Sequence, residues 1–115
     1  MKVPVSKAEF QVFNELSKRN LTIGMETQRQ ITLKVVNNEV EKEVPTTPDF
    51  WWIYKHKMVY LDGDAVHEIG SEWDEQVVKS LEVMRFKVRR IRYHAPLTEQ
   101  RKLEIVDDIQ EFIKE

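Results

Sequence analysis

The spacing of apolar residues along the chain predicts a mixture of helices and strands. Apolar positions recur at helical spacing after Ser6, Ser71 and Thr98, and each of these residues can cap a helix N-terminus. Between the helices, apolar and polar residues alternate as they do in half-buried strands. The predicted elements are a helix over 6–20, strands over 23–35, 39–44, 49–54 and 58–62, a helix over 71–84, a strand over 86–93 and a final helix from 98. The pattern therefore predicts an α/β chain with a mixed sheet, an α+β arrangement, in the order α-β-β-β-β-α-β-α.

Two of the predicted strands carry an aspartate at one end. Asp49 opens one strand and Asp62 closes the next. Pairing the two as a hairpin that turns near His56 places Trp51 opposite Tyr60 and Asp49 opposite Asp62. Like charges directly opposite each other destabilise a sheet unless something neutralises them, and a hard divalent cation binds such oxygen ligands. The register therefore predicts a metal site formed by Asp49 and Asp62.

Each of the first two helices places an acid inside its apolar arc. At 100° per residue, Glu9 falls in the middle of the apolar face of the first helix, and Asp74 falls in that of the second. An acid that faces a core is costly unless a partner or a metal offsets its desolvation. Both acids also stand three residues after a serine, where a carboxylate can cap the helix. Two interpretations are open, a shared polar pocket and a pair of helix caps.

Composition limits the class of protein. The chain has 115 residues, which is the size of one domain (1–115), and 41% of them are hydrophobic while 33% are charged. It contains no cysteine, so disulfides and thiolate metal sites are excluded, which favours a cytoplasmic, intracellular protein. No apolar run approaches the roughly 18 residues of a membrane span, and the N-terminus lacks the apolar segment of a signal peptide. We expect no membrane partner.

The net charge of −2 conceals a local excess of positive charge. Strand alternation puts the basic residues of the last predicted strand on both of its faces. A basic stripe beside an acidic pocket suits an enzyme that holds phosphates and binds a metal, whereas a solvated surface strand would have the same composition. The candidate DNA-binding residues in this stripe are Lys87, Arg89, Arg90 and Arg92.

The order of these short motifs resembles a known family. The chain has a helix with a leading glutamate, the sequence Arg29-Gln30-Ile31, the sequence Pro48-Asp49-Phe50, an apolar strand into Asp62-Gly63, then His67, Asp74 and the strand from Phe86 to Ile91. This arrangement resembles the very-short-patch-repair (Vsr)-like and DUF559 branch of the restriction-endonuclease-like PD-(D/E)xK nuclease superfamily. The resemblance covers nearly the whole chain and is best from Pro48 to Ile91.

The resemblance implies a restriction-endonuclease-like core and roles for individual residues. Asp49 matches the acid that binds magnesium, and His67 matches the histidine near the scissile phosphate. Glu9 and Asp74 match the flanking helix acids, and Gln30 matches a glutamine close to the site. The chain departs from the family in several ways. It has no lysine two residues after Asp62, Tyr60 replaces a glutamate, and the zinc ligands and aromatic wedge of mismatch-repair relatives are absent.

The sequence thus leads to one expectation and two alternatives. We expect a DNA endonuclease that hydrolyses phosphodiester bonds with Mg²⁺ or Mn²⁺ and that pairs as a homodimer to cut both strands. In this scheme Asp49, His67, Asp74 and Glu9 are catalytic, and His67 activates water or protonates the leaving group. The missing lysine favours the first alternative, a catalytically inactive nuclease-fold module for DNA binding or assembly. The second is an unrelated α+β scaffold, in which His67 is an ordinary loop residue.

Overall fold

The computed structural model describes residues 6–63 and 71–115, apart from the side chains of residues 37 and 71–74. It confirms the α+β class, with helices, a mixed sheet and a second small sheet. Each predicted element except the strand over 23–35 has one counterpart within a few residues of its expected position. The elements are α1 (Lys7–Lys18), β1 (Met25–Thr27), β2 (Ile31–Asn37), β3 (Val40–Thr46), β4 (Phe50–Trp52), the 3-10 turn η1 (Ile53–Lys55), β5 (Lys57–Gly63), α2 (Ser71–Val83), β6 (Lys87–Tyr93) and α3 (Glu99–Lys114).

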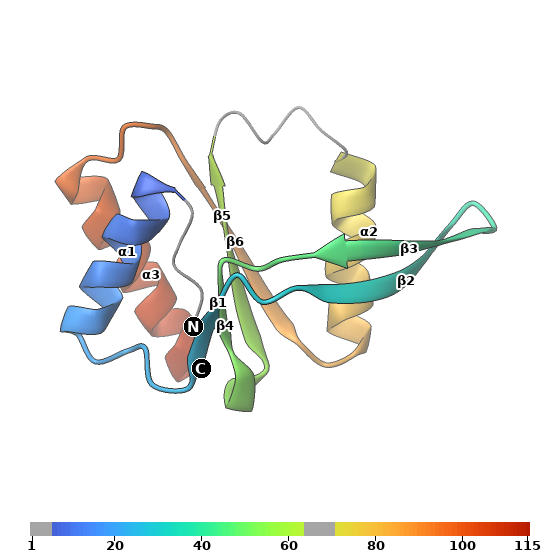
Figure 1. Cartoon of the computed structure of the whole chain (residues 1–115), viewed down its shortest axis with the longest axis horizontal. Coiled ribbons are helices and arrows are strands. Elements are labelled where there is room, and N and C mark those ends of the chain that lie inside the picture. Colours follow the sequence, from blue (N-terminus) through green and yellow to red (C-terminus); the bar gives the residue numbers. More distant parts are fainter. Residues whose placement is uncertain (1–5, 64–70) are drawn as a thin grey trace.

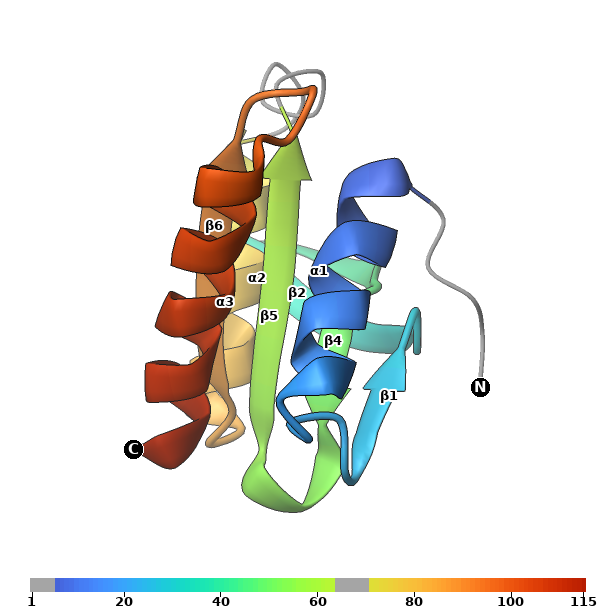
Figure 2. The same cartoon turned by 90° about the vertical axis from the view of Figure 1, so that its left-hand side faces the viewer.

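The main sheet has the strand order β1-β4-β5-β6. Strands β1, β4 and β5 pair antiparallel, whereas β5 and β6 pair parallel. A parallel pair needs a long crossover connection, and α2 lies within it. Helices α1 and α3 cover one face of this sheet, and α2 lies on the other face beside the β2–β3 hairpin (Figures 1 and 2). Residues from α1, from the end of β1 and from the start of β4 therefore meet near one side of the sheet.

The predicted strand over 23–35 is wrong as a single element. It is two strands in two different sheets, β1 in the main sheet and β2 in the hairpin with β3. The chain leaves the main sheet at Gln28, whose φ of 55° lies in the left-handed region that strands do not adopt. Apolar residues continue at odd positions on both sides of this break, so alternation alone does not reveal it. The order is therefore α-β-β-β-β-β-α-β-α rather than the predicted order with one strand fewer.

The predicted register of the β4–β5 hairpin is also wrong, by two residues. Trp51 pairs with Met58 rather than with Tyr60, because η1 and the left-handed His56 make the connection longer than the tight turn that the prediction assumed. A shift of two residues keeps every side chain on its predicted face. It does move Asp49 away from the position opposite Asp62.

The two faces of the sheet bury separate cores. The core under α1 and α3 includes Val12, Phe50, Trp52, Val59, Leu61 and Ile109. The core under α2 and the hairpin includes Leu33, Val35, Trp51, Met58, Tyr60 and Leu81. Trp51 and Trp52 are thus packing residues on opposite faces of β4, as their alternation predicts.

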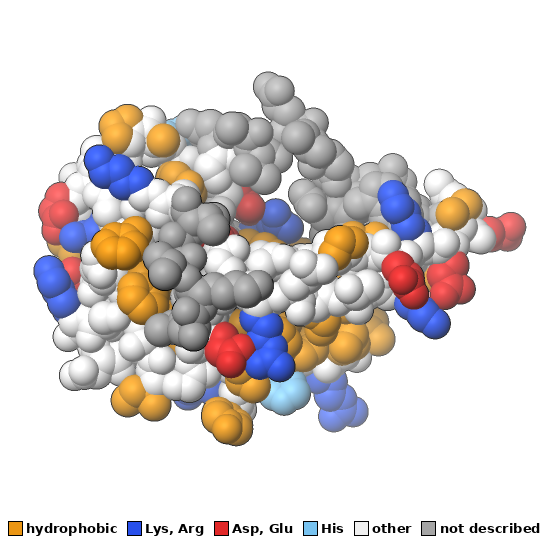
Figure 3. All heavy atoms as spheres, viewed as in Figure 1, with side chains coloured by type: hydrophobic (Ala, Val, Ile, Leu, Met, Phe, Trp, Pro, Cys, Tyr) orange, Lys and Arg blue, Asp and Glu red, His pale blue; other side chains and the backbone are white. Residues whose placement is uncertain are grey.

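The outer surface of the β2–β3 hairpin carries side chains of both charge signs (Figure 3). Such a surface suits a solvated arm better than a site for a polyanion. Across the parts of the chain that the structure describes, every helix is too short or too polar to cross a membrane.

Candidate functional site

Glu9 is a buried acid in the first turn of α1. Ser6 caps the helix, and its Oγ accepts a hydrogen bond from the backbone N–H of Glu9 at 3.1 Å. The side chain of Glu9 is only 7% exposed, and its Oε2 accepts a hydrogen bond from Gln28. The carboxylate therefore belongs to a buried polar cluster.

Asp49 lies between Pro48 and the start of β4, where the chain enters the main sheet. Its backbone N–H donates to the carbonyl of Val59 at 3.0 Å, and its Oδ2 accepts from the backbone N–H of Leu61 at 2.6 Å. Both partners belong to β5, so the neighbouring strand fixes the backbone and the side chain of Asp49 together. A carboxylate held in this way is preorganised before any ligand arrives.

Gln28 joins the two acids. Its Nε2 lies 2.8 Å from Oε2 of Glu9 and 3.3 Å from Oδ1 of Asp49. The three residues come from a helix, a strand connection and the start of a strand, and the fold brings them into one contact. The resemblance assigns a glutamine near the site to Gln30, but Gln30 is exposed and the glutamine that bridges the acids is Gln28. We refer to Glu9, Gln28 and Asp49 as the acid cluster.

The electrostatics of the acid cluster favour a proton on Asp49 at neutral pH. Burial raises the pKa of the Asp49 carboxyl, and a side-chain hydrogen bond to Glu9 and the charge of Glu9 raise it further, to about 8. The hydrogen bonds from Leu61 and Gln28 oppose the rise because they stabilise the ionised form. Two carboxyl groups in contact cannot both ionise at low cost, so the cluster favours whatever supplies positive charge, either a proton or a metal ion.

Tyr93 lies at the border of the acid cluster. Its hydroxyl makes a hydrogen bond with the side chain of Ser6, and burial raises its pKa, with smaller contributions from Glu9, Asp49 and Asp62. A Cβ on Gly63 would lie 3.0 Å from the Tyr93 hydroxyl, so the ring occupies the space that a side chain at position 63 would need. A hollow of about 430 Å³ opens beside this point and is lined by Ser6, Lys7, Ala8, Gln11, Tyr93 and residues 95–97.

Asp62 is placed differently from the prediction. Its carboxylate is 6% exposed and binds the guanidinium of Arg90 through both oxygens, each at 2.9 Å. Arg90 also lies over the ring of Tyr60, at 5.0 Å from its centroid. Asp49 contacts Glu9 on α1, while Asp62 takes part in a bidentate ion pair with the neighbouring strand.

The other predicted basic residues have separate surroundings. Lys87 and Arg89 lie on the α3 face of β6, and Arg90 lies on the α2 face, as alternation predicts. Arg89 lies over the ring of Phe112 and forms ion pairs with α3 and its end, while Arg92 is exposed. The stripe is therefore divided between the two faces of β6.

Two predicted site residues cannot be compared with the prediction. His67 lies outside the described residues. Asp74 belongs to α2, which covers the face opposite α1, but its side chain lies outside the described part of the chain. Convergence of these two residues on the acid cluster stays a prediction.

The donor set of the acid cluster fits Mg²⁺, because this ion is commonly held by one or two carboxylates and keeps several waters. Glu9 and Asp49 supply the two carboxylates, and the two side chains contact each other. Within residues 6–63 and 71–115, apart from the side chains named above, no group of three or more histidines and acids could hold a metal ion. A site of the zinc type, with a full set of protein ligands, is therefore not formed by the described residues.

No protein-family model matches the chain. No match was found among curated proteins or among solved structures.

Proposed function

We propose that this protein is a metal-dependent DNA endonuclease of the restriction-endonuclease-like type, with Mg²⁺ or Mn²⁺ as its cofactor. The observation that carries the proposal is the acid cluster. Glu9 and Asp49, singled out independently by the helix pattern and by the strand pattern, meet through Gln28 although 40 residues separate them in sequence. A buried carboxyl whose pKa is raised as strongly as that of Asp49 is characteristic of functional sites.

In this scheme Asp49 and Glu9 would hold the ion. The ion would act as a Lewis acid that polarises the phosphodiester and offsets charge on the leaving oxygen. The backbone N–H of Leu61 holds one oxygen of Asp49, and the amide of Gln28 holds one oxygen of each acid. Because these bonds hold the carboxylates in place, substrate binding would require no change in their side-chain conformation. Tyr93, whose hydroxyl is bonded to Ser6, lines the hollow.

The remaining parts of the proposal follow from the resemblance. His67 would activate water or protonate the leaving group, and Asp74 would orient it. Exposed basic residues, Lys87 and Arg92 among them, would contribute to phosphate binding, and two copies would cut the two strands of DNA. The lack of cysteine supports a cytoplasmic site of action.

The test is a cleavage assay on end-labelled duplex, branched and single-stranded DNA with Mg²⁺, Mn²⁺ or EDTA. The proposal predicts metal-dependent cleavage by the unmodified protein and a loss of at least about a hundredfold for Asp49→Ala and for Glu9→Ala, since each removes one of two ligands. Glu111→Gln, an exposed acid on α3, is the matched control and should keep full activity. Absence of cleavage on every substrate and metal would refute the endonuclease.

A second function is favoured by the surroundings of Asp62. No lysine follows it at the family's spacing, and its carboxylate is bound by Arg90. Arginine keeps its proton at all working pH values, so it cannot replace a lysine that exchanges a proton. The alternative is a catalytically inactive nuclease-fold module that binds DNA or assembles with other proteins. It predicts DNA binding in a gel-shift assay that Asp49→Ala leaves unchanged, together with no cleavage.

A further inference from the structure

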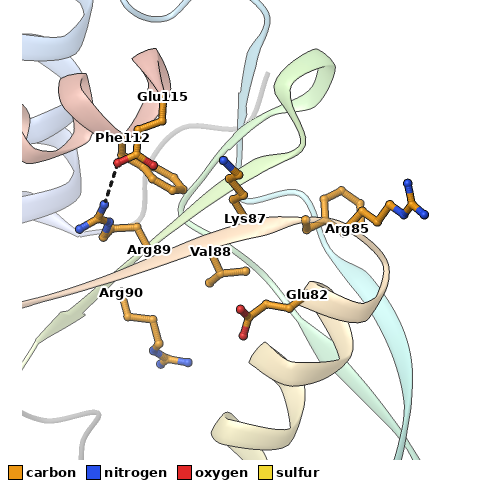
Figure 4. A pocket seen from close by; sticks show the side chains of 9 residues that line it. Glu82, Arg85, Lys87, Val88, Arg89, Arg90, Phe112 and Glu115 are labelled. Atoms are coloured by element: carbon orange, nitrogen blue, oxygen red, sulfur yellow. Dashed lines mark ion pairs between the residues drawn. The ribbon is translucent and has the colours of Figure 1, made fainter.

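A groove runs along the outer edge of the main sheet. It has a volume of about 700 Å³, and its floor is the continuous segment 85–90 that leads into β6. Figure 4 shows β6 between two walls, with Phe112 and Glu115 at the end of α3 on one side and Glu82 of α2 on the other. Side chains from β6 point toward both walls. This groove is distinct from the acid cluster, none of whose residues line it.

The backbone of β6 is oriented to extend the sheet. In the described part of the chain, β6 is the last strand and pairs with β5 alone. The N–H of Lys87 donates to the carbonyl of His56 at 2.8 Å, so this residue faces the β5 side. Because successive residues of a strand point their backbone groups in opposite directions, the N–H and C=O of Val88 point outward into the groove. An edge of this kind is a template for another strand.

The groove also has an excess of positive charge. Arg85, Lys87, Arg89 and Arg90 line it together with Glu82 and Glu115. Arg89 and Arg90 are ion-paired with acids of α3 and β5, so the excess rests on Arg85 and Lys87. Arg85 and Lys87 are exposed. Exposed cations beside a strand edge attract an anionic partner.

We propose that the β6 edge is a docking site for an acidic segment of another protein, which binds in an extended conformation and adds a strand to the main sheet. Backbone hydrogen bonds to the β6 edge supply affinity, and carboxylates on alternate residues reach the exposed cations Arg85 and Lys87. Val88, on the face of β6 opposite Lys87, accepts small apolar residues at the positions between. A segment of about five residues, roughly 17 Å long, fills the groove.

Two other occupants fit the groove less well. A second copy that paired through the same edge would bring Lys87 and Arg89 against the same cations, a repulsive arrangement. The phosphates of a nucleic acid only accept hydrogen bonds, whereas the strand edge presents alternating donors and acceptors. An acidic strand matches both the charge and the backbone pattern.

The probe is a fluorescein-labelled peptide of eight residues, alternating Glu and Val, with blocked termini, measured by fluorescence anisotropy at 50 mM and 200 mM salt. We expect saturable binding that weakens with salt, and a loss of about tenfold or more in the Arg85→Glu/Lys87→Glu double variant. Lys34→Glu, an exposed charge reversal on the hairpin, is the matched control and should bind as the unmodified protein does. Equal melting temperatures would show that both variants fold.

A second peptide, N-methylated at alternate residues, separates strand addition from charge attraction, because methylation removes backbone donors and leaves the carboxylates unchanged. The proposal predicts loss of binding for this peptide and amide shift changes confined to residues 86–90 and the end of α3. Equal binding of the methylated peptide, or displacement by single-stranded DNA at equal charge, would show a general polyanion surface and overturn it. No binding at millimolar peptide would show that the cations only protect the edge from pairing, and concentration-dependent dimerisation through β6 would assign the edge to self-association.

Discussion

Replacing Asp49 with asparagine should raise the stability of the protein at alkaline pH while it removes the proposed metal ligand. Asparagine keeps the shape of the side chain, so its Oδ1 still accepts from the Leu61 N–H and its amide still reaches Glu9. It therefore imitates the protonated form of Asp49, which the folded protein favours. Stability gained by removing an active-site acid is a common trade with function.

The direction and size of the effect follow from the pKa of Asp49. The pKa rises from 3.8 to about 8 on folding, so the folded protein holds a proton that the unfolded chain has released between about pH 4 and pH 8. The free energy of unfolding therefore falls as pH rises through this window. At about 1.4 kcal/mol for each pKa unit, the rise sets an upper limit of roughly 6 kcal/mol. Asp49 keeps partial contact with solvent and shares the proton with Glu9, so we expect about 2 kcal/mol.

The assay is urea unfolding followed by circular dichroism at pH 5, 6, 7 and 8.5, with EDTA present throughout. The unmodified protein should lose about 2 kcal/mol from pH 5 to pH 8.5, whereas Asp49→Asn should lose little and exceed it at pH 8.5. Glu111→Gln makes the same change of charge at an exposed site and should follow the unmodified protein. If Asp49→Asn were less stable at every pH and kept the slope of the unmodified protein, Asp49 would be an ordinary structural acid.

Three further substitutions test neighbouring contacts. Gln28→Ala removes a hydrogen bond that lowers the pKa of Asp49, so an NMR titration of the carboxyl group should give a higher pKa than in the unmodified protein. An unchanged or lower pKa would contradict the hydrogen bond between Gln28 and Asp49. Arg90→Ala leaves the buried carboxylate of Asp62 without its bidentate partner, so urea unfolding should show a loss of stability of about 2–3 kcal/mol. The double variant Asp62→Asn/Arg90→Ala should recover part of that loss, because it also removes the buried charge. Lys57→Met removes an ammonium group that donates to two carbonyls at the end of α3, at 2.7 Å each. It should lower stability by about 1–2 kcal/mol and speed amide exchange in the last turn of α3, whereas unchanged exchange would show that this end of α3 does not need the lysine.

The sequence predicted element types more reliably than their connections. Caps at Ser6 and Thr98 lie where the spacing placed them, because capping depends on local residues alone. The break at Gln28 could not be predicted, since a non-glycine residue in the left-handed region has no signature in an alternating pattern. The turn from Ile53 to His56 escaped prediction for the same reason, and the hairpin register changed with it.

The two acids of the acid cluster could be predicted from the sequence, but their contact with each other and with Gln28 could not. The position of Glu9 inside an apolar arc and of Asp49 before a buried strand both signalled acids with a reason to be buried. Their mutual contact depends on how α1 packs against the sheet, which is a tertiary property. Gln28 had no signal beyond a short polar run between two strands, and Arg90 was read as a DNA contact although its partner, Asp62, lies on the next strand.

Binding of Mn²⁺ to the purified protein, measured by isothermal titration calorimetry after removal of bound metal with EDTA, tests the central claim most directly. The account predicts one saturable site per chain, lost in both Asp49→Asn and Glu9→Gln and retained in Glu111→Gln and in Asp62→Asn. Retention of Mn²⁺ binding in Asp62→Asn is the most specific of these results, because Asp62 is bound by Arg90 and is not a proposed ligand. No saturable binding, or equal binding by Asp49→Asn and the unmodified protein, would contradict a metal centre at Glu9 and Asp49.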